Sequence, residues 1–252
     1  MNIDVIIVNY NAGQLLLECV QSVLKSTVPV NILISNNGEK VTGSFTDSRV
    51  HVTENNANLG FSKGNNRVLE QAKSEYILFL NPDCMIQPDT LKQLLKVMEA
   101  DVAIGMVGPV IRNLDGSEQR GCRRRFPTPL SALKNNFNRH QEPLPKQPID
   151  VEAISGAFML VRRSALDTVG PWDEDYFLHC EDLDLCMRFH LAGFRIVFVP
   201  TVSVLHIKGA CSSGRPLFVQ WHMHKGMVQF YRKFYQDKYP WLLMWVVFAG
   251  IW

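Results

Sequence analysis

Residues 170–188 read GPWDEDYFLHCEDLDLCMR, the most informative stretch of the chain. It places six carboxylates among large apolar and aromatic side chains, and carboxylates are rarely buried unless they are paired or put to use. From Glu181 onward the pattern is helical, because apolar residues recur on one face and Asp184 precedes Arg188 by four residues. Gly193 marks the end of this helix.

The predicted helix carries Glu181 and Asp182 in its first turn, and two interpretations fit that placement. Acids at a helix N-terminus often do no more than complement the helix dipole. A carboxylate held there also stays ionised at neutral pH and can serve as a general base, with the aromatic loop before it as one wall of a substrate pocket. The rest of the chain has to decide between the two.

Composition places the chain among globular proteins. Its 252 residues suffice for a sizeable core, with 46% hydrophobic and 20% charged residues, and the net charge of +2 gives no argument for nucleic-acid binding. Six scattered cysteines without a CxxC pair indicate neither a disulfide framework nor a zinc site. The N-terminus has no basic region, and its apolar run is too short for a signal peptide. We therefore expect reduced thiols and a cytoplasmic location.

The N-terminal segment predicts a parallel sheet. Residues 3–8 and 30–34 are short β-branched runs typical of buried strands, and residues 15–24 between them have helical spacing. This favours a right-handed βαβ unit, in which ligands bind beyond the C-terminal ends of the strands. The polar tails at 9–11 and 35–38 lie at that edge, as ligand-binding loops or as ordinary Asn and Gly turns.

Two further loops follow strands of the same sheet. Residues 58–66 read NLGFSKGNN, before a helix that runs to about Ala72, and the glycines suit a close ligand or a plain capped loop. The strand at 76–80 ends in Asn81-Pro82-Asp83, where Asp83 suits a divalent cation or is a turn aspartate. Neither a GxGxxG nor a Walker sequence is present.

Strands are expected at 104–110, 154–161, 194–199 and 202–206. A helix opened by Pro88 runs to about residue 99, and residues 139–150 form a Pro-rich loop. His206, at the end of the last strand, is a structural histidine or a metal ligand. A loop with four arginines suits phosphates or, more commonly, solvent: Arg120, Arg123, Arg124 and Arg125.

The C-terminal segment is aromatic and apolar. Residues 216–235 suit a helix rich in aromatic and basic side chains, and residues 241–252 are almost wholly apolar. The apolar stretch is shorter than the ~20 residues that a spanning helix needs. It suits insertion into one leaflet with the basic helix at the interface, or docking on the domain's own core.

Together these motifs resemble family 2 inverting glycosyltransferases of the GT-A fold, most closely a bacterial rhamnosyltransferase-like branch. Each motif is weak alone, but their joint order is specific. The matching segments are residues 8–11, 58–61 with 64–66, 81–83, 155–157, 172–174 with 176–177, 181–185 with Arg188, and His206.

The resemblance implies an α/β fold of the GT-A type. A mixed, mostly parallel, Rossmann-like sheet flanked by helices would occupy residues 1–212. Its nucleotide-sugar half would extend to about residue 110, and its acceptor half would follow. Residues 213–252 would be a helical, membrane-associating segment.

The resemblance also implies residue roles. Asp83, in place of the family's D-x-D motif, would bind Mg²⁺ or Mn²⁺ together with His206. Asp182 would be the catalytic base, with Glu181 beside it, and a single displacement would invert the anomeric centre. The implied nucleotide-sugar site comprises Tyr10, Asn11, Asn36, Gly60, Phe61, Asn65, Asn81 and Asp83, and the implied acceptor site comprises Gly156, Trp172 and Asp173.

The sequence departs from the family pattern in two places. Asn81 replaces the first acid of D-x-D, which leaves one carboxylate in that motif. Ser35 replaces the acid that usually accepts from the imide N–H of uracil or thymine, so the base of the donor stays open.

The predicted function is transfer of a sugar, such as rhamnose from dTDP-rhamnose, to a saccharide hydroxyl in cell-surface polysaccharide synthesis. A polyprenyl-diphosphate-linked acceptor would place the enzyme on the cytoplasmic face of the inner membrane. Two other classes stay open. One is a non-catalytic nucleotide-sugar-binding or membrane-binding module, and the other is an NAD-dependent oxidoreductase, whose glycine fingerprint is missing after the first strand.

Overall fold

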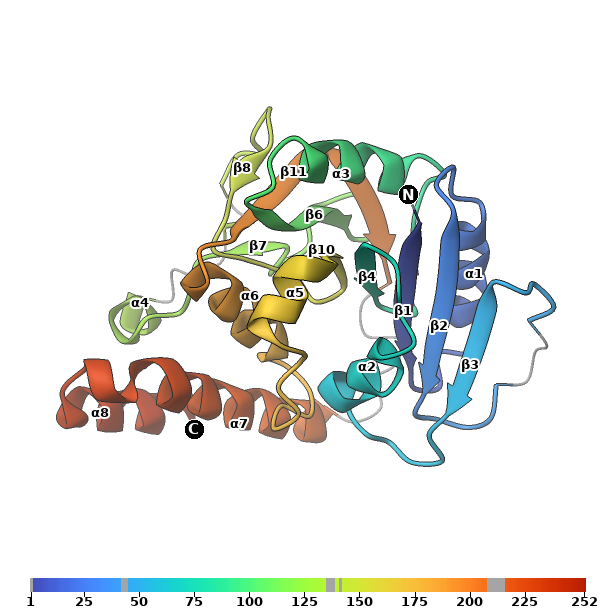
Figure 1. Ribbon diagram of the computed structural model, residues 1–252. Helices are drawn as coiled ribbons and strands as arrows, with labels where there is room; N and C mark the ends of the chain where they lie inside the picture. Colours follow the sequence, from blue (N-terminus) through green and yellow to red (C-terminus); the bar gives the residue numbers. More distant parts are fainter. Residues whose placement is uncertain (1, 42–44, 135–138, 141, 208–215) are drawn as a thin grey trace.

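The computed structural model describes residues 2–41, 45–134, 139–140, 142–207 and 216–252 (Figure 1). The central sheet has the strand order β3-β2-β1-β4-β10-β6-β11-β5, and β8 adds to it by pairing with β11. Its strands are β1 (Ile3–Asn9), β2 (Val30–Asn36), β3 (Val50–Glu54), β4 (Tyr76–Leu80), β5 (Cys84–Met85), β6 (Ile104–Arg112), β8 (Ile149–Asp150), β10 (Phe158–Arg162) and β11 (Arg195–His206). A separate small sheet pairs β7 (Arg123–Arg124) with β9 (Ala153–Ile154).

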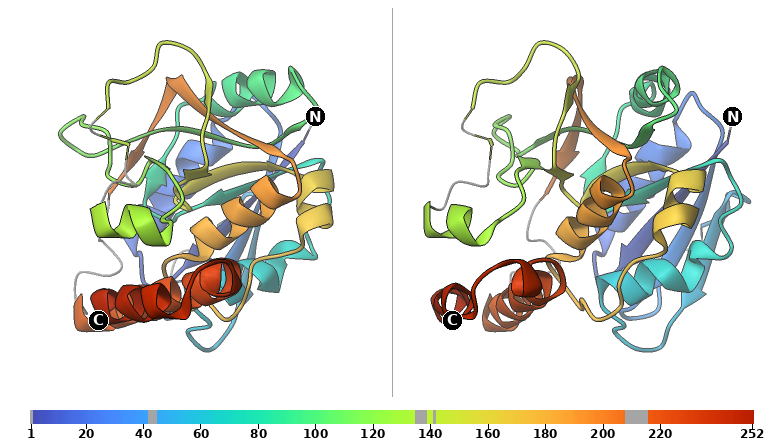
Figure 2. Two further views of the ribbon diagram at one scale, coloured as in Figure 1. Left: turned by 90° about the vertical axis from the view of Figure 1, so that its left-hand side faces the viewer. Right: turned by 60° about the vertical axis from the view of Figure 1, so that its left-hand side comes forward.

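Helices cover both faces of the central sheet (Figure 1). One face carries α1 (Gln14–Leu24) and α3 (Thr90–Glu99), and the other carries α2 (Phe61–Leu69), α5 (Arg163–Val169) and α6 (Glu181–Leu191). The short helix α4 (Pro129–Lys134) lies outside these layers. Figure 2 shows α7 (Pro216–Tyr235) and α8 (Trp241–Ile251) running together along one end of the molecule, joined by a 3-10 turn at Gln236–Lys238.

The two central strands explain the continuous apolar runs in the sequence. Every residue of β1 and of β4 is buried, because helices cover both faces of the sheet there. β1 pairs in parallel with both β2 and β4, whereas β10 runs antiparallel between β4 and β6. The predicted α/β class, with a mixed and mostly parallel sheet, is confirmed.

Two predicted elements differ from the structure. The strands expected at 194–199 and 202–206 are one strand, β11, whose register against β6 shifts between Val199 and Ser203. Pro200 lacks an N–H, and its position inside the irregularity makes a bulge rather than a strand end. The strand expected at 154–161 is broken, because residues 155–157 connect β9 of the small sheet to β10 of the central sheet.

The C-terminal helices combine a buried and an exposed side. Met244 and Val247 of α8 join the core, whereas Trp241 and Trp245 are exposed. In the described part of the chain, every helix is too short or too polar to reach across a lipid bilayer. The predicted domain boundary at 212–213 lies outside the described residues.

Candidate functional site

A cavity of about 390 Å³ opens at the C-terminal ends of β1, β4 and β11. This is the edge at which open α/β sheets bind their ligands. Segments that are far apart in the sequence line it together, including Tyr10, Gly60 and Phe61, Asn81 to Asp83, Ser155 to Ala157, Glu181 and Asp182, His206, and Phe218 and Val219.

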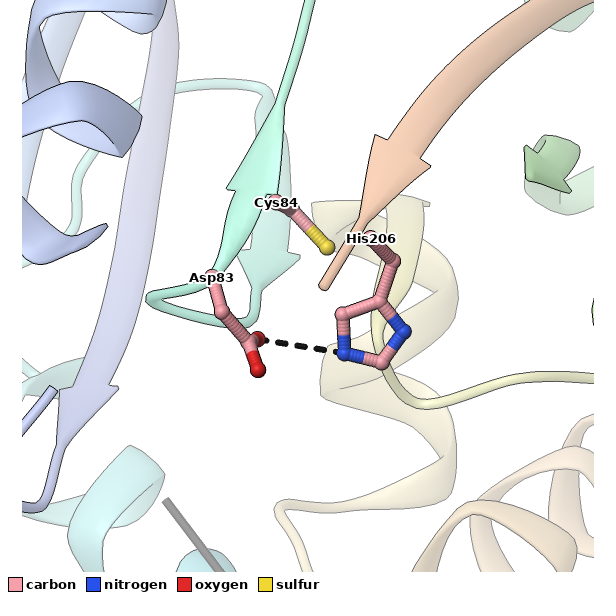
Figure 3. A group of neighbouring side chains, drawn as sticks. All are labelled: Asp83, Cys84 and His206. Carbon is pink, nitrogen blue, oxygen red and sulfur yellow. Dashed lines mark ion pairs between the residues drawn. The ribbon is translucent and has the colours of Figure 1, made fainter. Parts of the chain in front are cut away.

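Asp83 and His206 face each other in this cavity (Figure 3). Their neighbouring strand ends meet because β5 pairs with the end of β11. Asp83 Oδ1 lies 3.1 Å from His206 Nε2, and both side chains are buried. His206 Nδ1 lies 2.7 Å from Gln119 Oε1, and the Gln119 amide donates to Asn113. The Gln119 oxygen can therefore accept a hydrogen bond from Nδ1–H, and in that tautomer the Nε2 lone pair faces Asp83.

The Asp83–His206 pair fits a divalent cation. A carboxylate oxygen and an imidazole lone pair are both metal donors, and they repel each other unless a cation or proton lies between them. Asp83 Oδ1 is buried and has no hydrogen-bond partner among the described residues, which is costly without a further partner. The hydrogen bond from His206 to Gln119 is the kind that orients a metal-binding histidine.

Cys84 lies beside this pair but has a different role. Ligand atoms of Asp83, Cys84 and His206 all lie within 4.8 Å of one another. Burial, and then the Asp83 carboxylate, raise the pKa of the Cys84 thiol well above its usual range. The thiol donates instead to the Ala157 carbonyl oxygen at 3.4 Å, which leaves Asp83 and His206 as the better ligands.

Asp182 occupies the first turn of α6, as the sequence predicted. Its Oδ2 accepts from Arg124 Nη2 at 2.6 Å and from the Gly156 N–H at 3.0 Å, and its Oδ1 accepts from the Leu183 N–H at 2.8 Å. Burial raises the pKa of Asp182, but Arg124 and the Gly156 N–H outweigh it, and the net shift is downward. This carboxylate is therefore ionised at neutral pH.

Glu181, the neighbouring residue, is shifted in the opposite direction. Burial and then the negative charge of Asp182 raise its pKa to about 8. Its Oε2 is buried without a hydrogen-bond partner among the described residues. The pKa values of these two adjacent carboxyl groups thus move in opposite directions. At neutral pH one group is ionised and the other is largely protonated, as is often found for the acid and the base of an active site.

The loop before α6 has an unusual backbone that α7 holds in place. His179 and Cys180 both have φ near +69°, a left-handed conformation that is costly outside glycine. Gly226 of α7 packs against it, since a Cβ there would lie 2.7 Å from the His179 carbonyl oxygen. Strain of this kind gathers at functional sites.

The implied nucleotide-sugar residues divide into two groups. The first, which lines the cavity, contains Tyr10, Gly60, Phe61, Asn81 and Asp83.

The second group lies outside the lining and supports loops. Asn11 accepts from the Glu39 N–H at 2.8 Å, and Asn65 donates to the Phe61 carbonyl oxygen at 2.9 Å. Asn36 is fully buried, and its amide nitrogen donates to Glu54 Oε2 at 2.5 Å.

The implied acceptor residues are also split. Gly156 lines the cavity beside Asp182. Trp172 is buried behind it, with its ring edge-on to Phe61 at 5.3 Å. Asp173 lies outside the lining and pairs with Lys233 of α7 at 2.6 Å.

Several residues at the site were not predicted for the roles they have. Gln119 orients His206, Arg124 pairs with Asp182, and Phe218 of α7 closes one side of the cavity. The only signal in the sequence was the arginine cluster, which suggested phosphates or solvent rather than a carboxylate partner. Nothing in the sequence around Gln119 or Phe218 indicated a role at the site, because each contacts site residues that are distant in the sequence.

The family model described as "Glycosyltransferase like family 2" matches residues 2–216. N-acetylglucosaminyl-diphospho-decaprenol L-rhamnosyltransferase of Mycobacterium tuberculosis is 32% identical over 243 residues, which cover 84% of this chain and 78% of that protein. Rhamnosyltransferase WbbL of Escherichia coli K12 is 32% identical over 180 residues, which cover 65% of this chain and 67% of that protein.

Two solved structures share the fold. The mannosyltransferase PcManGT of Pyrobaculum calidifontis, in complex with GDP-Man and Mn²⁺, has a TM-score of 0.65 at 17% identity, over 94% of this chain and 65% of that one. GalNAc-T7 with UDP, GalNAc and Mn²⁺ has a TM-score of 0.63 at 18% identity, over 82% of this chain and 44% of that one. This chain thus spans less than two thirds of each, and at such identities the likeness concerns the fold.

Proposed function

The chain belongs to glycosyltransferase family 2, and from this premise we propose that it transfers rhamnose from dTDP-rhamnose to a hydroxyl of a saccharide on polyprenyl diphosphate. It is an enzyme, a glycosyltransferase of the GT-A fold. The names of two relatives support the choice of rhamnose, and one of them supports the lipid-linked acceptor. Such acceptors suit the synthesis of a cell-surface polysaccharide.

The observation that carries the proposal is that Asp182 and the Asp83–His206 pair line one cavity. Direct displacement at an anomeric carbon needs a base for the incoming hydroxyl and charge neutralisation for the leaving diphosphate. An ionised carboxylate and a candidate cation site supply these two functions from different walls.

The residues of this chain would divide the reaction as follows. Asp182 takes the proton of the acceptor hydroxyl as that oxygen attacks the anomeric carbon from the face opposite the diphosphate, which inverts the centre. Asp83 and His206 would hold Mg²⁺ or Mn²⁺, which supplies positive charge to the diphosphate when bound. Glu181, largely protonated, offers a hydrogen-bond donor on the acceptor side.

We assign donor binding to the part of the cavity near the start of α2. Gly60 has φ +80° and directly precedes α2, and the Asn37 amide donates to the Gly60 carbonyl oxygen at 2.8 Å. We assign the diphosphate sugar to this turn together with Asn81, and the nucleoside to Tyr10 and Asn37, all of which line the cavity. Asn11, Asn36 and Asn65 then shape the donor site by supporting its loops.

The outer face of α7 and α8 supports peripheral association with the cytoplasmic face of the inner membrane. Leu217 and Trp221 of α7 are 80% and 58% exposed, and Trp241 and Trp245 of α8 are each 69% exposed. Exposed aromatic residues of this kind suit a membrane interface. Since Phe218 lines the cavity and precedes Trp221 by one turn of α7, the apolar face continues to the edge of the site.

Thermal unfolding tests the donor and the metal. The protein would be melted with dTDP, UDP, GDP, CDP and NAD⁺, each with and without Mn²⁺ or Mg²⁺. A ligand at a hundred times its dissociation constant adds ~2.7 kcal/mol, and about 2–4 °C per kcal/mol is expected at this size. A metal-dependent shift with dTDP is the expected result.

Transfer is tested with dTDP-rhamnose and a short-chain lipid-diphosphate N-acetylglucosamine, and the anomeric form of the product is read by NMR. A stabilising effect of NAD⁺ alone would contradict the proposal. Nucleotide binding without transfer from any sugar donor would favour a non-catalytic module.

A further inference from the structure

The arginine-rich loop at residues 113–125 does not act as one basic patch. Arg123 is buried in an ion pair within the loop, and Arg125 is exposed. Arg124, between them, reaches the candidate active site and pairs with Asp182. The three neighbouring arginines therefore have separate roles, and the central one concerns the proposed base.

The small sheet fixes Arg124. β7 pairs with β9 so that Arg124 lies opposite Ala153. Arg124 Nη2 donates to the Ile154 carbonyl oxygen at 2.7 Å as well as to Asp182 Oδ2 at 2.6 Å. Its side chain is only 13% exposed, so water screens the pair little. The guanidinium is thus anchored to the backbone on one side and holds the carboxylate on the other.

Gly156 completes this arrangement. Its N–H donates to the same Oδ2 at 3.0 Å, and a Cβ there would lie 3.2 Å from the Asp182 Cβ. The other oxygen, Oδ1, accepts from the Leu183 N–H at 2.8 Å. Oδ2 therefore accepts from a guanidinium and from a backbone N–H, which use both of its lone pairs. Oδ1 accepts from the Leu183 N–H and is the oxygen that Arg124 does not hold.

We propose that Arg124 is a positioning residue for the transfer, which holds Asp182 by Oδ2 so that Oδ1 receives the acceptor proton. The inference rests on the proposed function, because it requires a hydroxyl acceptor. In this step the acceptor O–H bond breaks, its proton passes to Oδ1, and the oxygen bonds to the anomeric carbon. The bond from that carbon to the diphosphate oxygen breaks, and its electron pair leaves with the diphosphate. Arg124 stays protonated throughout and acts through Asp182 alone.

The expected effect follows from geometry. A base misplaced by about 1 Å can cost roughly 10²-fold in rate. R124Q should therefore lower kcat about 10²-fold and leave the KM for the donor nearly unchanged. R124K keeps the charge but replaces the planar guanidinium, whose Nη2 bonds both Ile154 and Asp182, with a shorter-reaching ammonium, and it should fall between R124Q and the wild type.

Two readouts separate positioning from mere structural support. Guanidinium ion added to R124A should restore part of kcat, because it can refill the space beside Asp182. In R124Q the acid limb of the pH profile of kcat/KM should move to higher pH, because Asp182 loses its positive partner. The other titratable groups that face Asp182 stay in place in this variant: Glu181 and Cys186 from its own helix, and His179 and Cys180 from the loop before it.

R125Q is the matched control, since Arg125 is exposed, is the next residue, and faces Glu142 at 3.4 Å. It should keep wild-type kcat and pH profile. R124Q with wild-type kcat would overturn the inference while transfer by the wild type upheld the proposed function. A folded R124Q with low kcat and an unmoved acid limb, together with an R124A that guanidinium does not rescue, would also overturn it. A wild type that transfers no sugar from any donor would refute both.

Discussion

The Asp83–His206 and Asp182–Arg124 pairs each join a buried or half-buried acid to a basic side chain in one cavity, yet they suit opposite tasks. His206 Nδ1 can donate a hydrogen bond to Gln119 Oε1, and in that tautomer the Nε2 lone pair faces Asp83. Arg124 cannot release its proton and always presents positive charge to Asp182. An imidazole nitrogen can share a cation with the carboxylate beside it, whereas a guanidinium takes the place of a cation.

This difference shows why a list of acids and bases in a pocket is not yet a mechanism. The partner decides whether a carboxylate binds metal or stays available for a proton. The state of Glu181 also depends on its surroundings. No positive group in the described chain outweighs its burial, and its pKa rises to about 8.

D182N removes the carboxylate of the Asp182–Arg124 pair and has the largest expected effect among these variants. Removal of a positioned base should lower kcat by about 10²–10⁴-fold. Donor binding in thermal unfolding should persist, because the role proposed for Asp182 is to act on the acceptor. D175N, an exposed acid in the same stretch, is the control and should be fully active. Loss of folding or of donor binding in D182N would show that Asp182 is a structural acid.

D83A removes the carboxylate of the Asp83–His206 pair. Without one of its two ligands the cation should bind weakly, and the metal-dependent stabilisation by dTDP, ~2.7 kcal/mol at a hundred times the dissociation constant, should disappear. The measurement is the melting temperature with dTDP, with and without Mn²⁺. D89A, at the exposed start of α3, should behave as wild type. Undiminished metal-dependent stabilisation in D83A would place the cation elsewhere.

E181Q tests whether the pKa values of the adjacent acids Glu181 and Asp182 shift in opposite directions. The pKa of Glu181 rises from 4.5 to about 8 on folding, so its contribution to stability is complete below 4.5 and is lost as the pH rises through about 8. Glutamine mimics the protonated form and should remove this alkaline loss, by about 1–3 kcal/mol. Urea unfolding of wild type and E181Q at a series of pH values measures it. Parallel curves would mean that the pKa of Glu181 is the same in the folded and the unfolded state.

The W221S/W245S double variant tests the exposed face of α7 and α8, which lies outside both acid–base pairs. It has the smallest expected effect on the rate of sugar transfer. Loss of two exposed tryptophans should weaken binding to anionic phospholipid vesicles by about tenfold or more, because each large apolar side chain gains roughly 1.5–3 kcal/mol on burial. Activity on a lipid-free acceptor should be unchanged. V102S, at an exposed valine between α3 and β6, is the control. Equal vesicle binding by all three proteins would exclude this face as the membrane contact.

The fold was largely predictable, because its signals are local. The apolar runs of β1 and β4 and the helical spacing of α1 and α6 follow from periodicity in neighbouring residues. Pro200 misled the prediction, since a residue without an N–H is typical of a strand end, and here a register shift accommodates it inside β11. The insertion of antiparallel β10 between β4 and β6 has no local signature.

The acids of the site were predictable from the sequence, but their partners were not. Asp83, Asp182, Glu181 and His206 stood out by residue type and by position at strand and helix ends, and the structure brings all four to one cavity. The role of each stays a prediction that the variants above test. Arg124 lies 58 residues from Asp182 along the chain, and no spacing rule joins them.

The α/β class, the order of most elements and the residues able to carry proton-transfer and metal chemistry follow from the sequence alone. Which base faces which acid, and hence why the pKa of Asp182 falls while that of Glu181 rises, follows from the folded arrangement. The two kinds of interaction differ in the sequence distance over which they act. Backbone preference and amphipathic period act between near neighbours in the chain, whereas desolvation and ion pairing sum over groups that folding brings together from distant segments.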